Sequence, residues 1–308
     1  AGKFITTPQP IFVRNSYNNE IIAETFLADI NILEEAIKQA SAVEKELRKT
    51  PAYIRYEILM QIANTMKARK DELSSVLAQE AAKPLRYAQA EIQRAIYTFI
   101  AAAEECKRPP MEYMRLDWEP TGKGKEGLIK YFPIGLIAGI SPFNFPMNLA
   151  VHKIAPAIAS GCPIILKPAT STPLSTLELA KIMDETALPK GAVSIIPMDR
   201  QTGNSLVTDE RFKLLTFTGS PSVGWKMKND AKKKKVVLEL GGNAGVLITS
   251  SADIDFAVKR CIVGAFAYAG QVCIHTQRIY VDKKIFPLFN EKFIEETKKL
   301  KAGHPLEI

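Results

Sequence analysis

Two residues in the C-terminal part of the chain could carry covalent chemistry. Glu239 lies in an apolar run over residues 236–240, which predicts a buried strand that ends at Gly241. Burial raises the pKa of a carboxyl group, which suits it to accept a proton near neutral pH. Cys273 follows Gly270, and small neighbours leave a thiol within reach of a substrate. A lone cysteine is more often a small buried hydrophobe, so the rest of the chain must decide between these interpretations.

The composition is that of an ordinary globular protein. The chain has 308 residues, 46% of them hydrophobic and 24% charged, which suits about two domains. The formal net charge of +8 could indicate nucleic-acid binding, but the lysines interleave with glutamates, which favours solvated helix faces. The four cysteines show neither metal-ligand spacing nor a disulfide framework, so we expect a cytoplasmic protein without a metal. No membrane segment and no leader peptide are expected.

The N-terminal part predicts helices that carry no catalytic residue. Extended segments are expected at 11–13 and 20–27. Apolar positions recur at three- and four-residue steps in the segments that follow, which is typical of amphipathic helices. The helices are expected over 33–47, after Pro51, from Asp71 to before Pro84, and over 88–100.

After residue 134, short apolar strands alternate with helices. This pattern predicts an α/β fold with a doubly wound parallel sheet. Strands are expected at 135–140, 163–167, 193–196, 214–217, 236–240, 246–249 and 279–281, and helices near 148–160, 174–186, 254–266 and up to 300.

A glycine pattern at Gly122, Gly124 and Gly127 matches the dinucleotide-binding fingerprint G-x-G-x-x-G. That fingerprint requires a strand before it and a helix after it. Here residues 128–132 continue as a strand, paired with one over 111–118. We therefore predict a hairpin turn.

Four stretches together resemble the aldehyde dehydrogenase superfamily. They are Pro142 to Pro146 with Asn144, Lys167-Pro168-Ala169, Phe217-Thr218-Gly219-Ser220 with Gly224, and the pair Glu239 and Cys273. The likeness covers most of the chain and corresponds to the N-terminal two-thirds of a family chain. It implies a Rossmann-like coenzyme-binding domain at 1–111 and 131–241, a bridging hairpin at 112–130, and an incomplete α/β catalytic domain at 242–308.

The resemblance implies oxidation of an aldehyde to a carboxylic acid with hydride transfer to NAD(P). The thiolate of Cys273 adds to the aldehyde, and Asn144 donates to the resulting oxyanion. Glu239 activates the water that hydrolyses the thioester. Lys153 matches a lysine that supports this polar network, although a solvent lysine is an alternative interpretation.

For coenzyme binding, the resemblance points to Lys167 at the adenosine ribose and to the turn after residue 217 at the pyrophosphate. Ser220 could equally be a plain helix cap. Thr170 stands where NAD-preferring relatives often have glutamate, so we expect NADP to be tolerated. Arg200 could add positive charge, and Asp199 could cancel it. The other coenzyme-binding residues implied are Ile140, Pro142, Gly219, Val223 and Gly241.

The substrate channel is implied at one helix face, formed by Phe145, Asn148, Leu149 and His152, with Val272 and Ile274 beside the thiol. Asn148 and His152 indicate a short, polar aldehyde, and a structural role is the alternative for His152.

Other functions stay open at this point. A relative that transfers its thioester to coenzyme A is one, but such relatives usually lack the carboxylate at Glu239. A catalytically silent binding protein is another, and the presence of Asn144, Glu239 and Cys273 disfavours it. The family's Glu-x-Phe-Gly-Pro element and C-terminal strand are not found here, so we expect a longer protein that forms a homodimer or homotetramer.

Overall fold

The computed structural model describes residues 2–307, and a five-stranded parallel sheet lies at its centre. Each strand is a short run of mostly apolar residues, which suits a sheet covered on both faces. The chain starts the sheet in the middle and adds strands first on one side and then on the other, so the predicted doubly wound α/β fold is confirmed. From edge to edge the strands are β7 (Val193–Ile195), β6 (Ile164–Lys167), β5 (Ile137–Ile140), β8 (Leu214–Gly219) and β9 (Lys235–Leu240).

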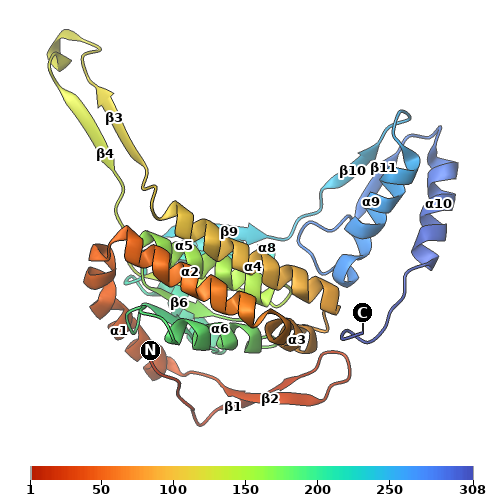
Figure 1. Cartoon of the computed structure of the whole chain (residues 1–308). Helices are drawn as coiled ribbons and strands as arrows, with labels where there is room; N and C mark the ends of the chain where they lie inside the picture. The colour runs from red at the N-terminus through yellow and green to blue at the C-terminus, as the bar shows by residue number, and fades with distance from the viewer. Residues whose placement is uncertain (1, 308) are drawn as a thin grey trace.

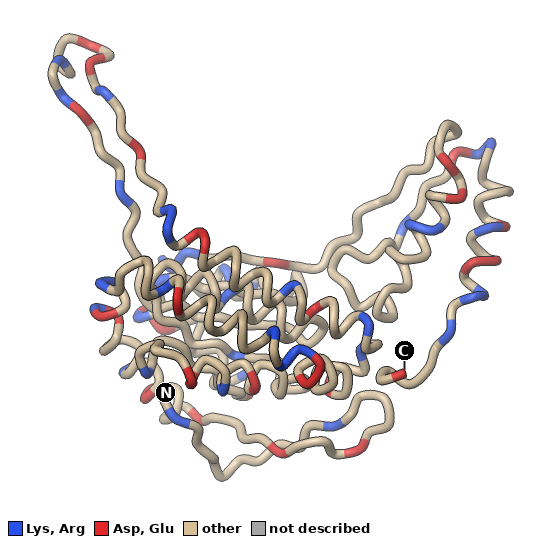
Figure 2. Tube along the Cα trace, viewed as in Figure 1, with Lys and Arg blue, Asp and Glu red and all other residues tan. Residues whose placement is uncertain are grey.

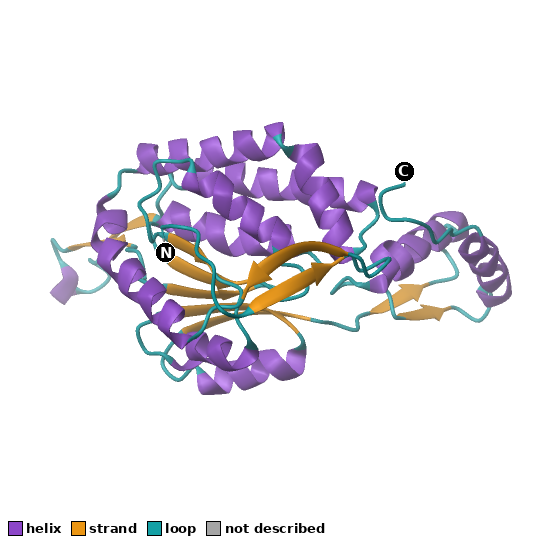
Figure 3. Cartoon of the chain, turned by 90° about the horizontal axis from the view of Figure 1, so that it is seen from below, coloured by secondary structure: helices purple, strands orange, loops and turns teal. Residues whose placement is uncertain are grey.

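Helices lie on both faces of this sheet (Figure 3). Successive side chains of a strand point to opposite faces, and accordingly Ile164 and Leu166 pack in one apolar core while Ile165 packs in the other. The first core is covered by α2 (Ala52–Ala68), α3 (Lys70–Ala81), α4 (Leu85–Glu105), α5 (Pro146–Ser160) and α6 (Leu174–Asp184). The second is covered by α1 (Ile30–Lys49), α7 (Arg200–Thr208) and α8 (Pro221–Asp230).

Two antiparallel hairpins extend from this body (Figure 1). One pairs β1 (Pro10–Arg14) with β2 (Ile21–Phe26), and the other pairs β3 (Met111–Arg115) with β4 (Glu126–Lys130). The glycines that match the dinucleotide fingerprint lie in the turn before β4 and in β4 itself, so the prediction of a hairpin turn is confirmed. A Cβ atom at Gly122 would lie 1.7 Å from the carbonyl oxygen of Leu116, so only glycine fits there.

The C-terminal residues form a smaller lobe beside the sheet (Figure 1). Its parallel strands pack against helices around Ile248, Val258, Cys261 and Phe289. The chain then returns to the main body, where the carbonyl of Pro305 accepts a hydrogen bond of 2.7 Å from the Leu85 N–H. The lobe contains β10 (Gly245–Ile248), α9 (Ile254–Phe266), the 3-10 helix η2 (Ala267–Gly270), β11 (Arg278–Val281) and α10 (Phe286–Lys298). The division into domains at 111, 131 and 241 stays a prediction.

The helix α7 was not among the helices expected from the sequence. Asp199 is its N-cap, and its side chain accepts a hydrogen bond of 2.7 Å from the Thr202 N–H. An aspartate that precedes a helix is a common start signal. The sequence pattern did not predict this helix because it contains Gly203, and a glycine inside a short segment weakens the helical pattern.

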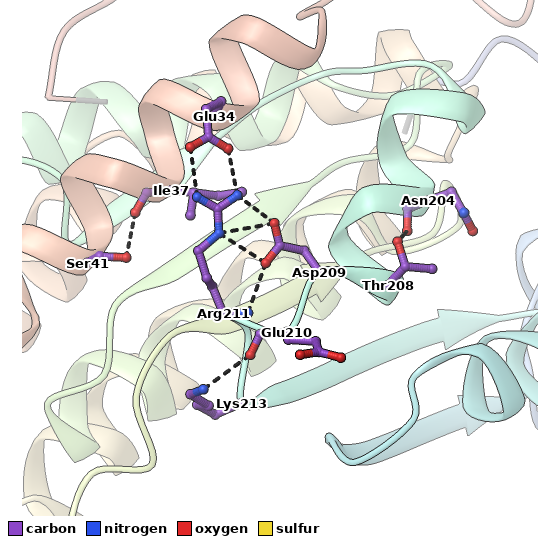
Figure 4. A network of polar contacts seen from close by, with 9 residues as sticks. All are labelled: Glu34, Ile37, Ser41, Asn204, Thr208, Asp209, Glu210, Arg211 and Lys213. Atoms are coloured by element: carbon purple, nitrogen blue, oxygen red, sulfur yellow. Dashed lines mark hydrogen bonds and ion pairs between the residues drawn. The ribbon is translucent and has the colours of Figure 1, made fainter.

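An ion-pair network joins α1 to the loop between α7 and β8 (Figure 4). The guanidinium of Arg211 donates to both carboxylate oxygens of Glu34, at 2.7 and 2.6 Å, and to Asp209. Such bidentate geometry is the most favourable for an ion pair near the surface. The network lies just before the amino end of β8, and the predicted site residues lie at the opposite, carboxyl ends of the strands.

Acidic and basic residues are interspersed along the chain in the body, the hairpins and the smaller lobe (Figure 2). This distribution agrees with the solvated helix faces expected from the sequence. Within residues 2–307, no helix combines the length and the apolar character needed to cross a membrane.

A buried carboxylate of α3 caps the N-terminus of α6, and it makes stability depend on pH. Glu80 accepts hydrogen bonds from the N–H groups of Leu174 and Ser175, and burial raises its pKa to about 7 from 4.5. The folded state therefore keeps this proton to a higher pH than the unfolded state does. Protonated Glu80 therefore adds to the free energy of unfolding below pH 4.5. This stabilisation is lost as the pH rises to about 7, a change of roughly 3 kcal/mol.

Denaturant unfolding from pH 4.5 to 8 should show this loss in the wild type. In the Glu80→Gln variant the free energy of unfolding should fall less over this pH range, because glutamine does not titrate. Equal slopes for the two proteins would contradict the assignment.

Candidate active site

The predicted coenzyme-binding residues gather at one edge of the sheet. Because β5, β6, β8 and β9 run parallel, their carboxyl ends lie side by side. Ligands of doubly wound folds bind at this edge. Ile140, Lys167 and Gly219 end three of these strands, Gly241 follows the fourth, and the half-buried Pro142 follows Ile140.

The amide of Asn144 reaches the segment that carries Cys273. Its Nδ2 atom donates a hydrogen bond of 2.8 Å to the carbonyl of Gln271. These residues are far apart in sequence, so the fold alone brings them together. The contact leaves the second N–H of the amide available to another acceptor.

Cys273 is exposed and follows a tight turn. Tyr268 and Ala269 have positive φ angles of 49° and 50°, which are unfavourable for side chains other than glycine. The carbonyl of Cys273 accepts a hydrogen bond of 3.3 Å from the Gly242 N–H, which ties the thiol segment to the end of β9. Next to the thiol, Val272 is half-buried and Ile274 is exposed.

Glu239 differs from the expectation of a buried carboxylate. It is exposed, and residues along β9 alternate between exposed and half-buried. The physical reason is that β9 is an edge strand of the sheet, so part of its surface has no covering layer among residues 2–307. Glu239 nevertheless lies near the carboxyl ends of the strands, where the Cys273 segment is held, and it pairs with Thr218 of β8 in the strand register.

Lys153 is buried, so the alternative interpretation as a solvent lysine is wrong. Its Nζ atom donates to the hydroxyl of Thr218 at 2.8 Å and to that of Thr216 at 3.3 Å. Burial lowers its pKa to about 8, and the charge of Glu239 partly opposes that shift. Lys153 can therefore gain and lose a proton within about one pH unit of neutrality.

Lys167 extends from β6 over the start of α7. Gly203 leaves room for its stem, since a Cβ atom there would lie 2.9 Å from the Lys167 Cδ. Burial lowers the pKa of Lys167, while the charge of Asp199 raises it and that of Arg200 lowers it. Thr170 is exposed in the loop that follows.

The N-terminus of α8 is open. Ser220 is its N-cap residue but makes no side-chain capping bond, and the exposed Val223 lies in its first turn. Gly224 brings this helix close to the sheet, because a Cβ atom there would lie 2.5 Å from the Leu240 side chain. Helix N-termini present free N–H groups to anions, so this geometry suits a pyrophosphate.

The predicted substrate residues lie on or next to α5 but differ in exposure. Phe145 precedes α5 and is half-buried, as is Leu149, whereas Asn148 is buried and His152 is exposed. The Asn148 Oδ1 has no hydrogen-bond partner among the described residues. Restricted hydration and the charge of Arg94 lower the pKa of His152. Arg94 belongs to α4, which packs against α5.

A buried ionic cluster under the site was missed. Lys83 pairs with Glu91, and both side chains are fully buried. One signal could have shown it, because Glu91 lies three residues after Ala88 and therefore on the apolar face of α4. A charge on a buried face requires a partner, but the sequence did not indicate which lysine supplies it.

The chain belongs to the aldehyde dehydrogenase family, whose sequence model matches residues 5–308. A 3-sulfolactaldehyde dehydrogenase of Priestia aryabhattai is 36% identical over 307 residues, which are 99% of this chain and 64% of the relative. A lactaldehyde dehydrogenase of Methanocaldococcus jannaschii is 37% identical over 99% of this chain and 66% of its own length. This chain thus spans only part of the length of these relatives.

Solved structures show the same fold. Aldehyde dehydrogenase 21 from Physcomitrella patens, in complex with the reaction product succinate, has a TM-score of 0.96 and 43% identity, over 100% of this chain and 64% of its own. The glyceraldehyde-3-phosphate dehydrogenase GapN from Methanocaldococcus jannaschii, complexed with NADP, has a TM-score of 0.90 and 37% identity, over 96% of this chain and 65% of its own.

Proposed function

We propose that this protein oxidises an aldehyde to a carboxylic acid and transfers a hydride to NAD or NADP. The observation that carries the proposal is the meeting of three segments at one sheet edge: the loop of Asn144, the turn of Cys273 and the end of β9 with Glu239. An amide donor, a thiol and a carboxylate are the groups that oxidation through a thioester requires. Membership of the family supports the assignment.

The thiolate sulfur of Cys273 forms a bond to the carbonyl carbon, and the carbonyl oxygen takes up the electron pair. The free N–H of Asn144 and the backbone N–H of Cys273 donate to this oxyanion. The bound coenzyme supplies a hydride acceptor, and loss of the hydride leaves a thioester on Cys273. Glu239 takes a proton from water as the water attacks, the carbon–sulfur bond breaks, and the acid and the thiolate separate. Lys153 holds Thr218 beside Glu239 in this network.

The residues at the sheet edge fit a dinucleotide. Among residues 2–307, Lys167 donates only to the Pro168 carbonyl, at 3.4 Å, so its ammonium group remains available for ribose hydroxyls. The open N-terminus of α8 suits the pyrophosphate. The NADP complexes among the similar structures support the use of this coenzyme.

Thr170→Glu should reduce the use of NADP. A glutamate near the 2′-phosphate adds a repulsion of about 1 to 4 kcal/mol per unit charge pair at 4 Å. The kcat/KM for NADP should fall by the corresponding factor, and that for NAD should be kept or improved. Thr170→Gln is the uncharged control and should leave the ratio near that of the wild type. No change with glutamate would show that residue 170 does not face the ribose.

The substrate that fits best is a short aldehyde with an anionic or strongly polar tail. Restricted hydration and the positive charge of Arg94, on the neighbouring helix α4, lower the pKa of His152 on the predicted channel face. Relatives named for sulfolactaldehyde and lactaldehyde, and a similar structure holding succinate, support this substrate class.

Arg94→Gln should therefore raise KM for a short aldehyde that carries a carboxylate. Loss of a charge-assisted hydrogen bond costs about 1.5 to 3 kcal/mol, which corresponds to roughly tenfold or more in KM. An uncharged aldehyde of the same length should be unaffected. Arg86→Gln changes an exposed arginine at the start of α4 and is the matched control. An equal effect on both aldehydes would exclude a role in recognising the tail.

Transfer of the thioester to coenzyme A is the alternative reaction, and the carboxylate of Glu239 at the site favours hydrolysis over it. The deciding experiment incubates the purified protein with short aldehydes, each coenzyme and coenzyme A, and identifies the products. A free acid with reduced coenzyme is expected. An acyl-coenzyme A product, or coenzyme binding without turnover of any aldehyde, would contradict the proposal.

The partners and the location follow from the same proposal. A small aldehyde is the partner that the family supports. We propose in addition that the protein forms a homodimer or homotetramer. We also propose that it lies in the cytoplasm, because its four free cysteines suit a reducing compartment. Light scattering of the purified protein tests the assembly.

A further inference from the structure

A fully buried ammonium group lies beneath the site and has no role in the chemistry described above. Lys83 lies in the turn between α3 and α4, and its partner Glu91 is equally buried. The loss of hydration of two buried charges offsets much of their attraction, so such a pair is a poor source of stability. Its contacts with the surrounding segments point to a different use.

On one side the pair holds the loop that carries Asn144. The Lys83 Nζ donates a hydrogen bond of 2.6 Å to the backbone carbonyl of Asn144. Glu91 Oε1 accepts from the N–H groups of Met147 and Asn148, at 3.1 and 3.0 Å, and so caps the first turn of α5. The backbone of this loop is therefore fixed from both ends.

On the other side the same ammonium group holds the turn that leads to Cys273. It lies 4.3 Å from the ring centroid of Tyr268 and 3.8 Å from that of Phe145, within the range of cation–π attraction. The Tyr268 hydroxyl also donates to the carbonyl of Ala81 at 3.0 Å. These contacts anchor a residue whose φ of 49° is unfavourable, and they keep the turn in its observed form.

We propose that Lys83 is a positioning residue, which sets the separation between the Asn144 amide and the Cys273 thiol by gathering both segments around one buried charge. The hydrogen bond from Asn144 to Gln271 then aligns the two segments at the surface. The effect of Lys83 on catalysis rests on the proposed function, whereas its effect on the position of the two segments does not.

Lys83→Met tests the proposal, because it keeps the unbranched side chain and removes the charge. Hydrogen exchange measured by mass spectrometry should rise in residues 143–149 and 266–273 and stay unchanged in α2 and β6. The double variant with Glu91→Gln avoids an unpaired buried carboxylate and replaces the single variant if that one does not fold. Lys70→Met is the control, since Lys70 joins α3 to α4 through Gln93 at 3.0 Å and, among the described residues, makes no hydrogen bond to either segment.

Activity supplies the second measurement. We normalise kcat to the amount of Cys273 that iodoacetamide can label in a parallel sample. This kcat should fall about tenfold or more, because a misplacement near 1 Å can cost about a hundredfold. The Kd of the coenzyme should stay within about twofold, since its adenosine half binds at other residues. Exchange that is unchanged at both segments, or that rises equally in all helices, would overturn the proposal. Should the protein oxidise no aldehyde, the exchange result still decides the role of Lys83.

Discussion

Replacing Cys273 with alanine should abolish aldehyde oxidation. The thiolate forms the covalent intermediate in the proposed reaction, and no other described side chain at the site can replace it as a nucleophile. Removal of a nucleophile from a preorganised site lowers kcat by a factor on the order of 10⁴ or more. The rate of coenzyme reduction measures the loss, and coenzyme binding should persist because the residues at β6 and α8 are unchanged.

Alkylation provides an independent test of the same residue. Cys273 is exposed, whereas Cys106, Cys162 and Cys261 are buried. Burial also raises the pKa of Cys106 and Cys261, which disfavours their thiolates. Iodoacetamide should therefore modify Cys273 first, and peptide mass spectrometry locates the adduct. The control Cys261→Ala should keep activity. Activity that survives Cys273→Ala, together with labelling at a buried cysteine, would remove Cys273 from the mechanism.

Glu239→Gln should separate the two halves of the reaction. The carboxylate acts on water only after hydride transfer, so the first half should proceed and thioester hydrolysis should slow by roughly 10² to 10⁴. Stopped-flow absorbance should then show a burst of reduced coenzyme that approaches one equivalent per site, followed by slow turnover. Mass spectrometry of the quenched protein should detect an acyl group on Cys273.

The matched control is Glu210→Gln, an exposed carboxylate at the opposite edge of the sheet. It should change neither the burst nor the steady-state rate. If Glu239→Gln suppressed the burst as strongly as turnover, the carboxylate would act before hydride transfer, and a different residue would have to activate water.

The sequence by itself determined the fold class. The period of apolar residues changes near residue 134 from long helical faces to short strands that alternate with helices, and this pattern depends only on local residue types. The motifs around Asn144, Lys167 and Ser220 indicated the family, and the family assignment is confirmed. The roles of the individual site residues stay predictions.

Only the tertiary structure decided how these residues are surrounded. An apolar strand with one glutamate suggested burial, but the position of β9 at the sheet edge leaves Glu239 exposed. Lys153 had two interpretations of nearly equal merit, and the packing of α5 on the sheet buried it. The contacts of Lys83 with Glu91, Asn144 and Tyr268 join segments distant in sequence. Local patterns do not specify such contacts, because burial and charge pairing depend on which elements pack together in space.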